Sequence, residues 1–551
     1  MMDEYGFLRG WVARCATLLV LQALLTGPSR AQTHVVELIH ASEVVVESDS
    51  VSGTVRRLSG DVRLRQDTIY LRSSRATHYV ERGEVLMDGS VRIVAGDDTL
   101  NANRVTYDAN EKVATAFGSV RISDGESVLL APSALYYSRD KLAVFSEGGR
   151  ILHDDAELTS PSGEYNTESK LATLAGPVVL RDSVSTLTAE SGRYDAQLER
   201  ADFLGSVRLV QDEILLEADS VSHFRETEVS EAFGHVVLER IGGAEEGEEA
   251  RVDSTRRTIL FGDEVRHDQS RSVSLVTGLP DLDPLVVRLQ TDSTGATDST
   301  FVRARRFETM ERDTLEGRES TLMAVGNVRL FQDRLAALAD SVSFVRFTVE
   351  LEDDSSQADY LYLFGIDRPS VWFEDSQVSG DTLVGYAADE EIQRLDVFGN
   401  AFAAQFDSTL GRVRQLRGLQ MRAILEDDSL RSLSVWPNAE AIHFRATADG
   451  LLDGADRLLA DSLVFGFEDG RLADVYGARG VEGITYGPQI IPDPFRLSGY
   501  RYTPESRPTR ASVLGEPTWE TEWLHANPDF SIPNTRDGLQ HLVESVPQRS
   551  P

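Results

Sequence analysis

The chain has 551 residues, of which 41% are hydrophobic and 26% charged, a composition too apolar for a wholly disordered protein. Its 55 Lys and Arg residues are outnumbered by 90 Asp and Glu residues, which gives a formal net charge of -35. Since no dense Lys/Arg run interrupts this acidity, the sequence argues against a surface that neutralises nucleic-acid phosphates. We therefore expect no nucleic acid among the partners.

The first residues have the pattern of a secretory signal peptide. Two arginines and a short apolar run at residues 16–25 precede Ser29 and Ala31, which fit a small-x-small cleavage site. The run is about half of the roughly 20 residues that a membrane-spanning helix needs. We therefore predict that residues 1–31 are removed and that the chain is exported. Cleavage would also remove Cys15, the only cysteine, so the mature chain would have no disulfides.

A repeat of 29 residues follows. Leucine recurs at constant spacing, at Leu71, Leu100, Leu129, Leu158, Leu187 and Leu216. A glycine column has the same period, at Gly60, Gly89, Gly118, Gly176, Gly205 and Gly234. A ring-bearing column contains His78, Tyr107, Tyr136, Tyr165, Tyr194 and His223. Regular columns of this kind are typical of stacked structural units.

Each repeat divides into two strands, because Asp, Asn and Gly form turn signals twice in each period. In the stretch from Val113 to Ser123, alternate apolar residues surround Gly118 and share one face, while Arg121 lies on the opposite, polar face. A glycine inside a strand usually marks a bend, so we expect each strand to fold into a V at this glycine. The apolar pattern of the preceding strand slips between Ala102 and Val105, which predicts a matching irregularity there.

The repeat breaks at the acidic stretch 242–250, and it resumes where GNVRLFQDRLAALADSVS at 326–343 repeats GSVRLVQDEILLEADSVS at 205–222. Ten of the 18 prolines lie in the last 65 residues, which we expect to be an extended or partly disordered tail with docking through Trp519 and Trp523. The predicted parts are a signal peptide at 1–31, a first β-trough at 32–240, an irregular acidic and polar connection at 241–319, a second β-trough at 320–486, and a Pro-rich tail at 487–551.

The alternation of G-x-V-x-[LI] strands with L-x-[AS]-x-x-x-x-Y strands resembles the OstA/LptA-like lipopolysaccharide-transport family, and V-x-G-N-A at 397–401 resembles its long OstA-like forms. The resemblance covers roughly residues 44–480. It implies an all-β fold, in which stacked antiparallel V-shaped strands form a jelly-roll or half-pipe trough. It also implies carriage of lipopolysaccharide between the inner and outer membranes.

The residues with inward parity are the candidate lining of a lipid groove. They are Val62, Leu64, Val91, Ile93, Ala116, Val120, Ile122, Val178, Leu180, Phe203, Val207, Leu209, Val236, Leu238, Val328 and Leu330. The same parity would also suit a closed solenoid whose side chains fill the interior. The Tyr/His column has two possible roles, an edge belt along the groove or a ring stack that holds the strand register, and the stack is favoured.

We expect a periplasmic lipid carrier that is not an enzyme and needs no cofactor, with association with the outer membrane also open. Its expected partners are lipopolysaccharide or lipid A and other transport proteins, which would pair with it end to end through strands, with peripheral contacts to membrane components also open. The alternatives are a closed β-solenoid scaffold or adhesin and, less favoured, a β-helical polysaccharide-processing enzyme. His153, His235, His267 and His443 have no metal-ligand spacing, so no metal site is predicted.

Overall fold

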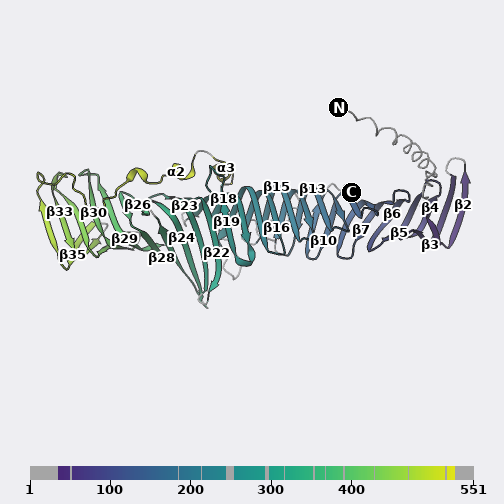
Figure 1. Ribbon diagram of the computed structural model, residues 1–551, viewed down its shortest axis with the longest axis horizontal. Coiled ribbons are helices and arrows are strands. Elements are labelled where there is room, and N and C mark those ends of the chain that lie inside the picture. The colour runs from purple at the N-terminus through teal and green to yellow at the C-terminus, as the bar shows by residue number, and fades with distance from the viewer. Residues whose placement is uncertain are drawn as a thin grey trace, which may run out of the picture. The chain divides into compact units, whose positions relative to one another are not determined.

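The computed structural model describes residues 35–527, except for 50–52, 184, 212–213, 243–252, 292–296, 315–316, 352–353, 366–367, 389–390, 427–428, 469–470 and 516–517. The expected signal peptide lies outside these residues. Nearly all of the described chain is antiparallel β-structure, which confirms the predicted all-β fold of stacked antiparallel strands (Figure 1). Two compact units divide the chain, unit 1 within Met1–Ile151 and Glu164–Glu168, and unit 2 within Leu152–Gly163 and Ser169–Pro551.

In unit 1 the long strands pair in chain order, each with the next. Its strands are β1 (Glu37–His40), β2 (Glu43–Asp49), β3 (Gly53–Gln66), β4 (Ile69–Tyr79), β5 (Glu84–Ala95), β6 (Asp98–Asp108), β7 (Val113–Ser123), β8 (Ser127–Tyr137) and β9 (Leu142–Phe145). Two further strands, β10 (Gly149–His153) and β12 (Ser162–Asn166), contribute residues to both units. Both β1 and β2 pair with β3.

Unit 2 continues the antiparallel pattern. Its strands are β11 (Ala156–Ser160), β13 (Leu171–Arg181), β14 (Ser185–Asp195), β15 (Arg200–Gln211), β16 (Ile214–Phe224), β17 (Val229–Gly242), β18 (Asp253–Asp268), β19 (Val273–Thr277), β20 (Leu285–Thr291), β21 (Thr297–Arg303), β22 (Arg306–Thr314), β23 (Gly317–Gln332), β24 (Leu335–Leu351), β25 (Asp354–Phe364), β26 (Ser370–Phe373), β27 (Ser376–Ser379), β28 (Thr382–Ala388), β29 (Glu391–Asp407), β30 (Arg412–Glu426), β31 (Ser429–Trp436), β32 (Ala439–Ala446), β33 (Leu452–Ala460), β34 (Ser462–Glu468), β35 (Arg471–Ala478) and β36 (Glu482–Tyr486). Its helices are η1 (Gln269–Arg271), η2 (Pro504–Ser506), α2 (Arg510–Leu514) and α3 (Trp519–Ala526).

The stretch 241–319, expected to be an irregular connection, contains strands β18 to β22 in its described part. Strand β18 pairs with β17 along most of its length, so regular pairing continues into this region. The proposed division into two troughs remains a prediction.

The strands that carry the column glycine bend there, as predicted; where Glu147 takes its place, the strand is interrupted between β9 and β10. In β7, Gly118 and Ser119 have positive φ angles of 76° and 50°, and the register with β8 shifts between Phe117 and Val120. Two consecutive left-handed residues turn the strand sharply, and the first favours glycine because it has no Cβ to strain this conformation. A Cβ on Gly118 would lie 2.7 Å from Nδ2 of Asn103, the residue in β6 where the register shifts in the same way.

The bend divides each long strand into two arms. We call the part before the glycine arm A and the part after it arm B; in β7 these are 113–117 and 120–123, and segments paired with them in other strands take the same names. Alternate residues of β7 are buried, including Ala116 and Ile122 at 0% exposure, while Arg121 between them is exposed. We call the buried side of both arms the inner face and the opposite side the outer face.

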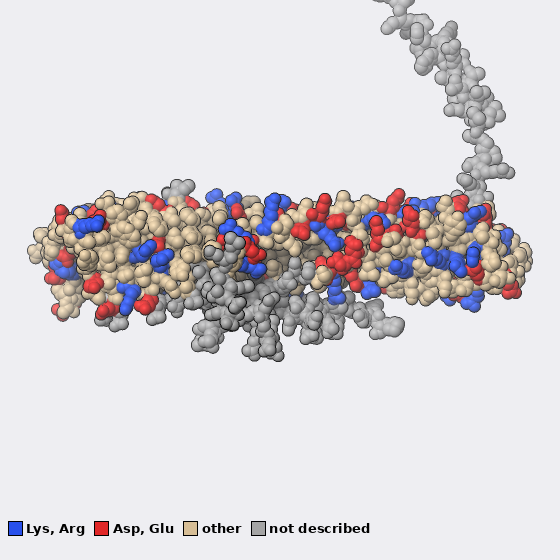
Figure 2. Space-filling model, turned by 90° about the horizontal axis from the view of Figure 1, so that it is seen from below, with Lys and Arg blue, Asp and Glu red and all other residues tan. Residues whose placement is uncertain are grey.

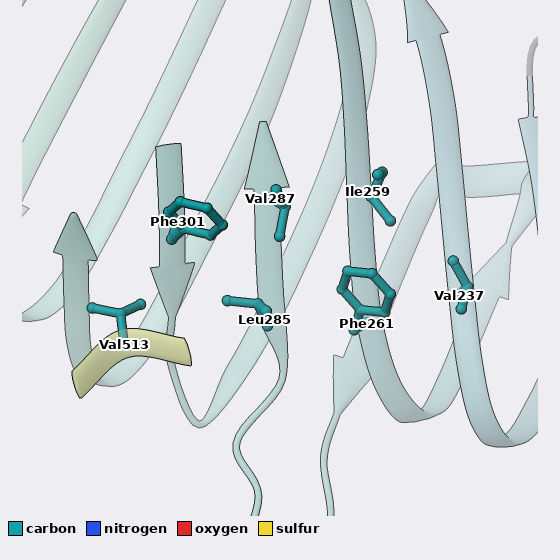
Figure 3. Packing of buried hydrophobic residues seen from close by; sticks show 7 residues of the cluster. All are labelled: Val237, Ile259, Phe261, Leu285, Val287, Phe301 and Val513. Carbon is teal, nitrogen blue, oxygen red and sulfur yellow. The ribbon is translucent and has the colours of Figure 1, made fainter. Parts of the chain in front are cut away.

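In part of unit 2 the outer face is buried as well. On β18, Leu260 pairs with the inner residue Leu238, yet its neighbours Ile259 and Phe261 are also fully buried. Figure 3 shows the outer cluster that these two residues join, which comprises Val237, Ile259, Phe261, Leu285, Val287, Phe301 and Val513 of α2. Residues of the C-terminal segment, Val513 of α2 among them, therefore cover the outer face of arm B over β17, β18, β20 and β21.

The two tail tryptophans dock as expected. Trp519 and Trp523 of α3 both contact Phe261 edge to face, with ring centroids 5.6 Å apart in each case. The indole Nε1 of Trp523 also donates to Glu217 of β16 over 3.0 Å. Earlier in the tail, Leu497 packs into a second outer cluster that contains Phe402 and Phe444.

Candidate functional site

The predicted lining residues all lie on strands, and most are buried on the inner face. Val62, Leu64, Val91, Ile93, Ala116, Val120, Ile122, Val178, Phe203, Val207, Val236, Val328 and Leu330 are at most 7% exposed. Leu180, Leu209 and Leu238 are partly exposed. Because these positions share one parity, they lie on the apolar inner face within each unit; whether a lipid occupies it remains a proposal.

The strand register arranges the inner residues in continuous rows. Leu100 lies opposite Ile122, and Ile122 lies opposite Leu129, so three strands contribute neighbouring side chains to one row. All three are at most 1% exposed. The row runs across the strands, along the direction in which the repeats stack, and so apolar contact passes from each repeat to the next.

Tyrosine hydroxyls close the interior of unit 1 at the free ends of the arms, which we call the mouth. Tyr107 donates across the mouth from arm A of β6 to Gln66 Oε1 at the end of arm B of β3, over 2.6 Å. Tyr136 and Tyr165 donate in the same way to Asp98 and Asp124, each over 2.5 Å. We call these three bonds the tyrosine latches.

The central latch belongs to a buried polar cluster. Asp98 is only 4% exposed and, besides Tyr136, accepts from Lys141 Nζ at 2.8 Å and Thr167 Oγ1 at 2.9 Å. Burial raises the pKa of the Tyr136 hydroxyl well above its usual value, so it remains a donor even at alkaline pH. Three donors thus share Oδ2 of this carboxylate while the latch is closed.

The structure places the tyrosine hydroxyls at the edge of the interior, the first of the two roles considered for this column. Sequence analysis missed their acceptors. Gln66 and Asp124 each lie 41 residues before their tyrosine, and Asp98 lies 38 residues before Tyr136. A search at the 29-residue period does not pair the tyrosines with their acceptors. The 41-residue separation occurs twice, and a search for residue pairs on opposite arms of the V could find this signal.

Other groups lie at the mouth in the first strands of unit 2. Tyr194, the next residue of the ring-bearing column after Tyr165, contacts the ring of His153, with ring centroids 6.0 Å apart. Arg225 forms an ion pair with Asp155 over 3.2 Å, and both side chains are about half exposed, at 42% and 52%. Exposed pairs of this kind contribute little to stability, so closure is weaker here than in unit 1.

The described residues hold no group of three or more His, Cys, Asp or Glu side chains that could bind a metal ion. None of their helices is both long enough and apolar enough to span a membrane. Figure 2 shows acidic and basic side chains interspersed on the face it presents, so no extended basic field appears on that face.

We predict that Tyr136→Phe destabilises unit 1 by about 1–2 kcal/mol, because buried Asp98 loses a hydrogen bond. Urea unfolding, together with hydrogen exchange of the β6 and β8 amides, measures this loss. Tyr137→Phe is the matched control, because the side chain of Tyr137 is only partly buried and lies on the other face of the strand. Equal effects of the two substitutions would contradict a stabilising role for the latch.

Comparison with known proteins agrees with the resemblance seen in the sequence. Residues 33–190 match the family model described as OstA-like protein. The chain has no match among curated proteins. The matched residues include all the long strands of unit 1 and reach into β14. The chain therefore carries an OstA-like domain at residues 33–190, of the family that its repeats had indicated.

Proposed function

We propose that the protein is a periplasmic lipid carrier that shields the acyl chains of lipopolysaccharide between its two arms. In this proposal it forms part of the bridge that moves this lipid from the inner to the outer membrane. The OstA-like domain supports a role in transport rather than catalysis. The proposal extends this role to a named lipid and a named compartment.

One observation carries the proposal: the apolar inner face is closed at the mouth of unit 1 by side-chain bonds. The latches of Tyr107, Tyr136 and Tyr165 can break without breaking the backbone pairing within either arm. Opening would expose rows such as Leu100, Ile122 and Leu129, on which acyl chains would be buried at roughly 0.8 kcal/mol per CH₂. The sugar and phosphate head would stay in water outside the mouth.

The first strands of unit 1 support end-to-end pairing with similar proteins. On β2, Val44, Val45 and Val46 are 44%, 43% and 60% exposed, and among the described residues this strand pairs with β3. An exposed apolar strand near the end of a sheet favours the addition of a partner strand. We propose that this edge contacts another transport protein with the same strand architecture.

A filled structural solenoid remains a second candidate, and the tight packing of unit 1 favours it there. Val85, Ala116 and Ile122 are at 0% exposure in the closed form. In a scaffold or adhesin this interior would stay closed, whereas a carrier must open it. The two functions therefore differ in whether lipid ever reaches the inner residues.

Photo-crosslinking in cells tests the proposal. A photoreactive residue at Val207 or Val328 on the inner face is expected to form lipopolysaccharide adducts, whereas the same residue at Arg121 or Arg208 on the outer face is not. Adducts confined to the inner positions would support the carrier. If neither set gives adducts, the filled solenoid is the better description.

A further inference from the structure

In arm B, the inner face of strands β29 and β32 has smaller residues than that of β7 in unit 1. In β7, the residues two and four positions after the glycine are Val120 and Ile122. After Gly399 of β29 the corresponding residues are Ala401 and Ala403, and β32 begins with alanine at the equivalent positions 439 and 441. At these positions of arm B the alanines occupy less of the interior than the larger residues of unit 1.

The register joins these alanines in one row of arm B. Ala403 lies opposite Leu416, Leu416 opposite Ala441, and Ala441 opposite Leu458. Phe402, between the two alanines of β29, points to the outer face and packs in the cluster that contains Leu497 of the tail. The tail therefore packs on the outer face of arm B, and the alanine row remains on its inner face.

The corresponding row of arm A is partly exposed. It contains Leu395, Ala423, Leu433 and Phe465, which lie opposite one another in β29, β30, β31 and β34. Its neighbouring row toward the bend, Val397, Met421, Val435 and Leu463, is at most 2% exposed. The interior is thus closed near the bend and accessible one row farther out.

The same row in unit 1 is sealed. Leu395 lies four residues before its glycine, as Ala114 does in β7. The row of Ala114 consists of Tyr107, Ala114, Tyr136 and Ala143, all at most 1% exposed, and it includes two of the latch tyrosines. Strands β29 to β34 have leucine, alanine and phenylalanine in these places, so the row lacks phenol groups.

We propose that strands β29 to β34 form the site where the acyl chains of the lipid first enter, between the Leu395 row and the Ala403 row. This inference rests on the proposed function and adds to it the place of loading. Aliphatic chains match the chemistry of both rows, which are apolar throughout. Unit 1 takes up chains only when its latches open, whereas this segment accepts them in the form described here.

Filling the site tests the inference in the full-length protein. A photoreactive residue at Leu433 is expected to form adducts with purified lipopolysaccharide, and the double variant Ala403→Phe/Ala441→Phe is expected to reduce them at least about fivefold. Leu419→Phe, at a side chain that is 49% exposed beside the bend, is the matched control and should leave the adducts unchanged. Circular dichroism checks that the β-structure of the double variant is retained.

A probe at Val207 separates this inference from the proposed function. Two results would overturn the loading site and leave the carrier intact. One is adducts at Val207 without adducts at Leu433. The other is adducts at Leu433 that the filled site does not reduce. Absence of adducts at both positions would overturn both proposals. Loss at Leu433 in the filled variant, with Leu419→Phe unaffected, supports the site.

Discussion

Arg303→Met is expected to release the tail from unit 2. The guanidinium of Arg303 is 4% exposed and donates from Nε to the carbonyl of Val513 over 2.6 Å and from Nη2 to that of Leu514 over 3.0 Å. It also pairs with Glu520, whose side chain is 2% exposed. Removing one partner of a buried ion pair leaves an uncompensated charge and costs about 3–5 kcal/mol.

Hydrogen exchange of the amides in α2 and α3 measures this effect directly. A loss of about 3–5 kcal/mol in docking corresponds to exchange that is faster by two to three orders of magnitude or more. Arg318→Met is the control, because Arg318 and its partner Asp313 are 62% and 89% exposed and such pairs contribute little. Unchanged exchange in Arg303→Met would mean that the apolar contacts alone hold the tail.

A second variant separates the charge from the packing. Arg303→Met combined with Glu520→Leu removes both buried charges, so it is expected to recover a large part of the lost docking energy. If the double variant is instead as weak as the single one, the bonds from Arg303 to the two tail carbonyls carry most of the effect. Neither variant replaces a residue of the cluster around Phe261.

The bend of each strand was predictable because one residue carries it. Glycine recurs at a constant spacing, and its left-handed φ, such as 81° at Gly205, is a conformation that residues with a Cβ adopt only under strain. The inward parity was predictable for the same reason, since side chains alternate along a strand. Both features depend on a single repeat and its immediate neighbours.

The sequence contains a signal for the covered outer face of unit 2, in the form of apolar runs that do not alternate with polar residues. The runs Ile-Leu-Phe at 259–261 and Leu-Val-Val at 285–287 are apolar without interruption, which is typical of strands buried on both faces. The segment that covers them could not be deduced from the sequence, because it lies far away in the chain. Arg303, for example, binds the carbonyl of Val513, which is 210 residues away. Contacts at such separation depend on the folded path of the tail.

The closure of the mouth could not be predicted from the period either. The tyrosine latches join residues 41 or 38 positions apart, and neither offset is a multiple of the 29-residue repeat. The offset reflects which strands' tips meet across the V, a property of the twist between the arms. Whether an inner row is sealed or accessible therefore follows from the assembled arms and from residue size together.

Ile122→Asp is expected to destabilise unit 1 by at least about 4 kcal/mol, because it removes a packed side chain and places a carboxylate in a dry interior. Ile122 is at 0% exposure and lies opposite Leu100 and Leu129. Since each strand of a stacked repeat packs mainly against its neighbours, the loss should be concentrated in β6, β7 and β8. Urea unfolding gives its size, and hydrogen exchange gives its location.

Arg121→Asp provides the control one residue away, because Arg121 is exposed on the outer face of the same strand. Substitutions at such positions usually change stability by no more than about 0.5 kcal/mol. A large loss for Ile122→Asp with a small one for Arg121→Asp is the result expected if the inner face is the hydrophobic core of the repeat. Comparable small losses would mean that water reaches Ile122, and an interior open to water could neither stabilise the bent strands nor exclude water from an acyl chain.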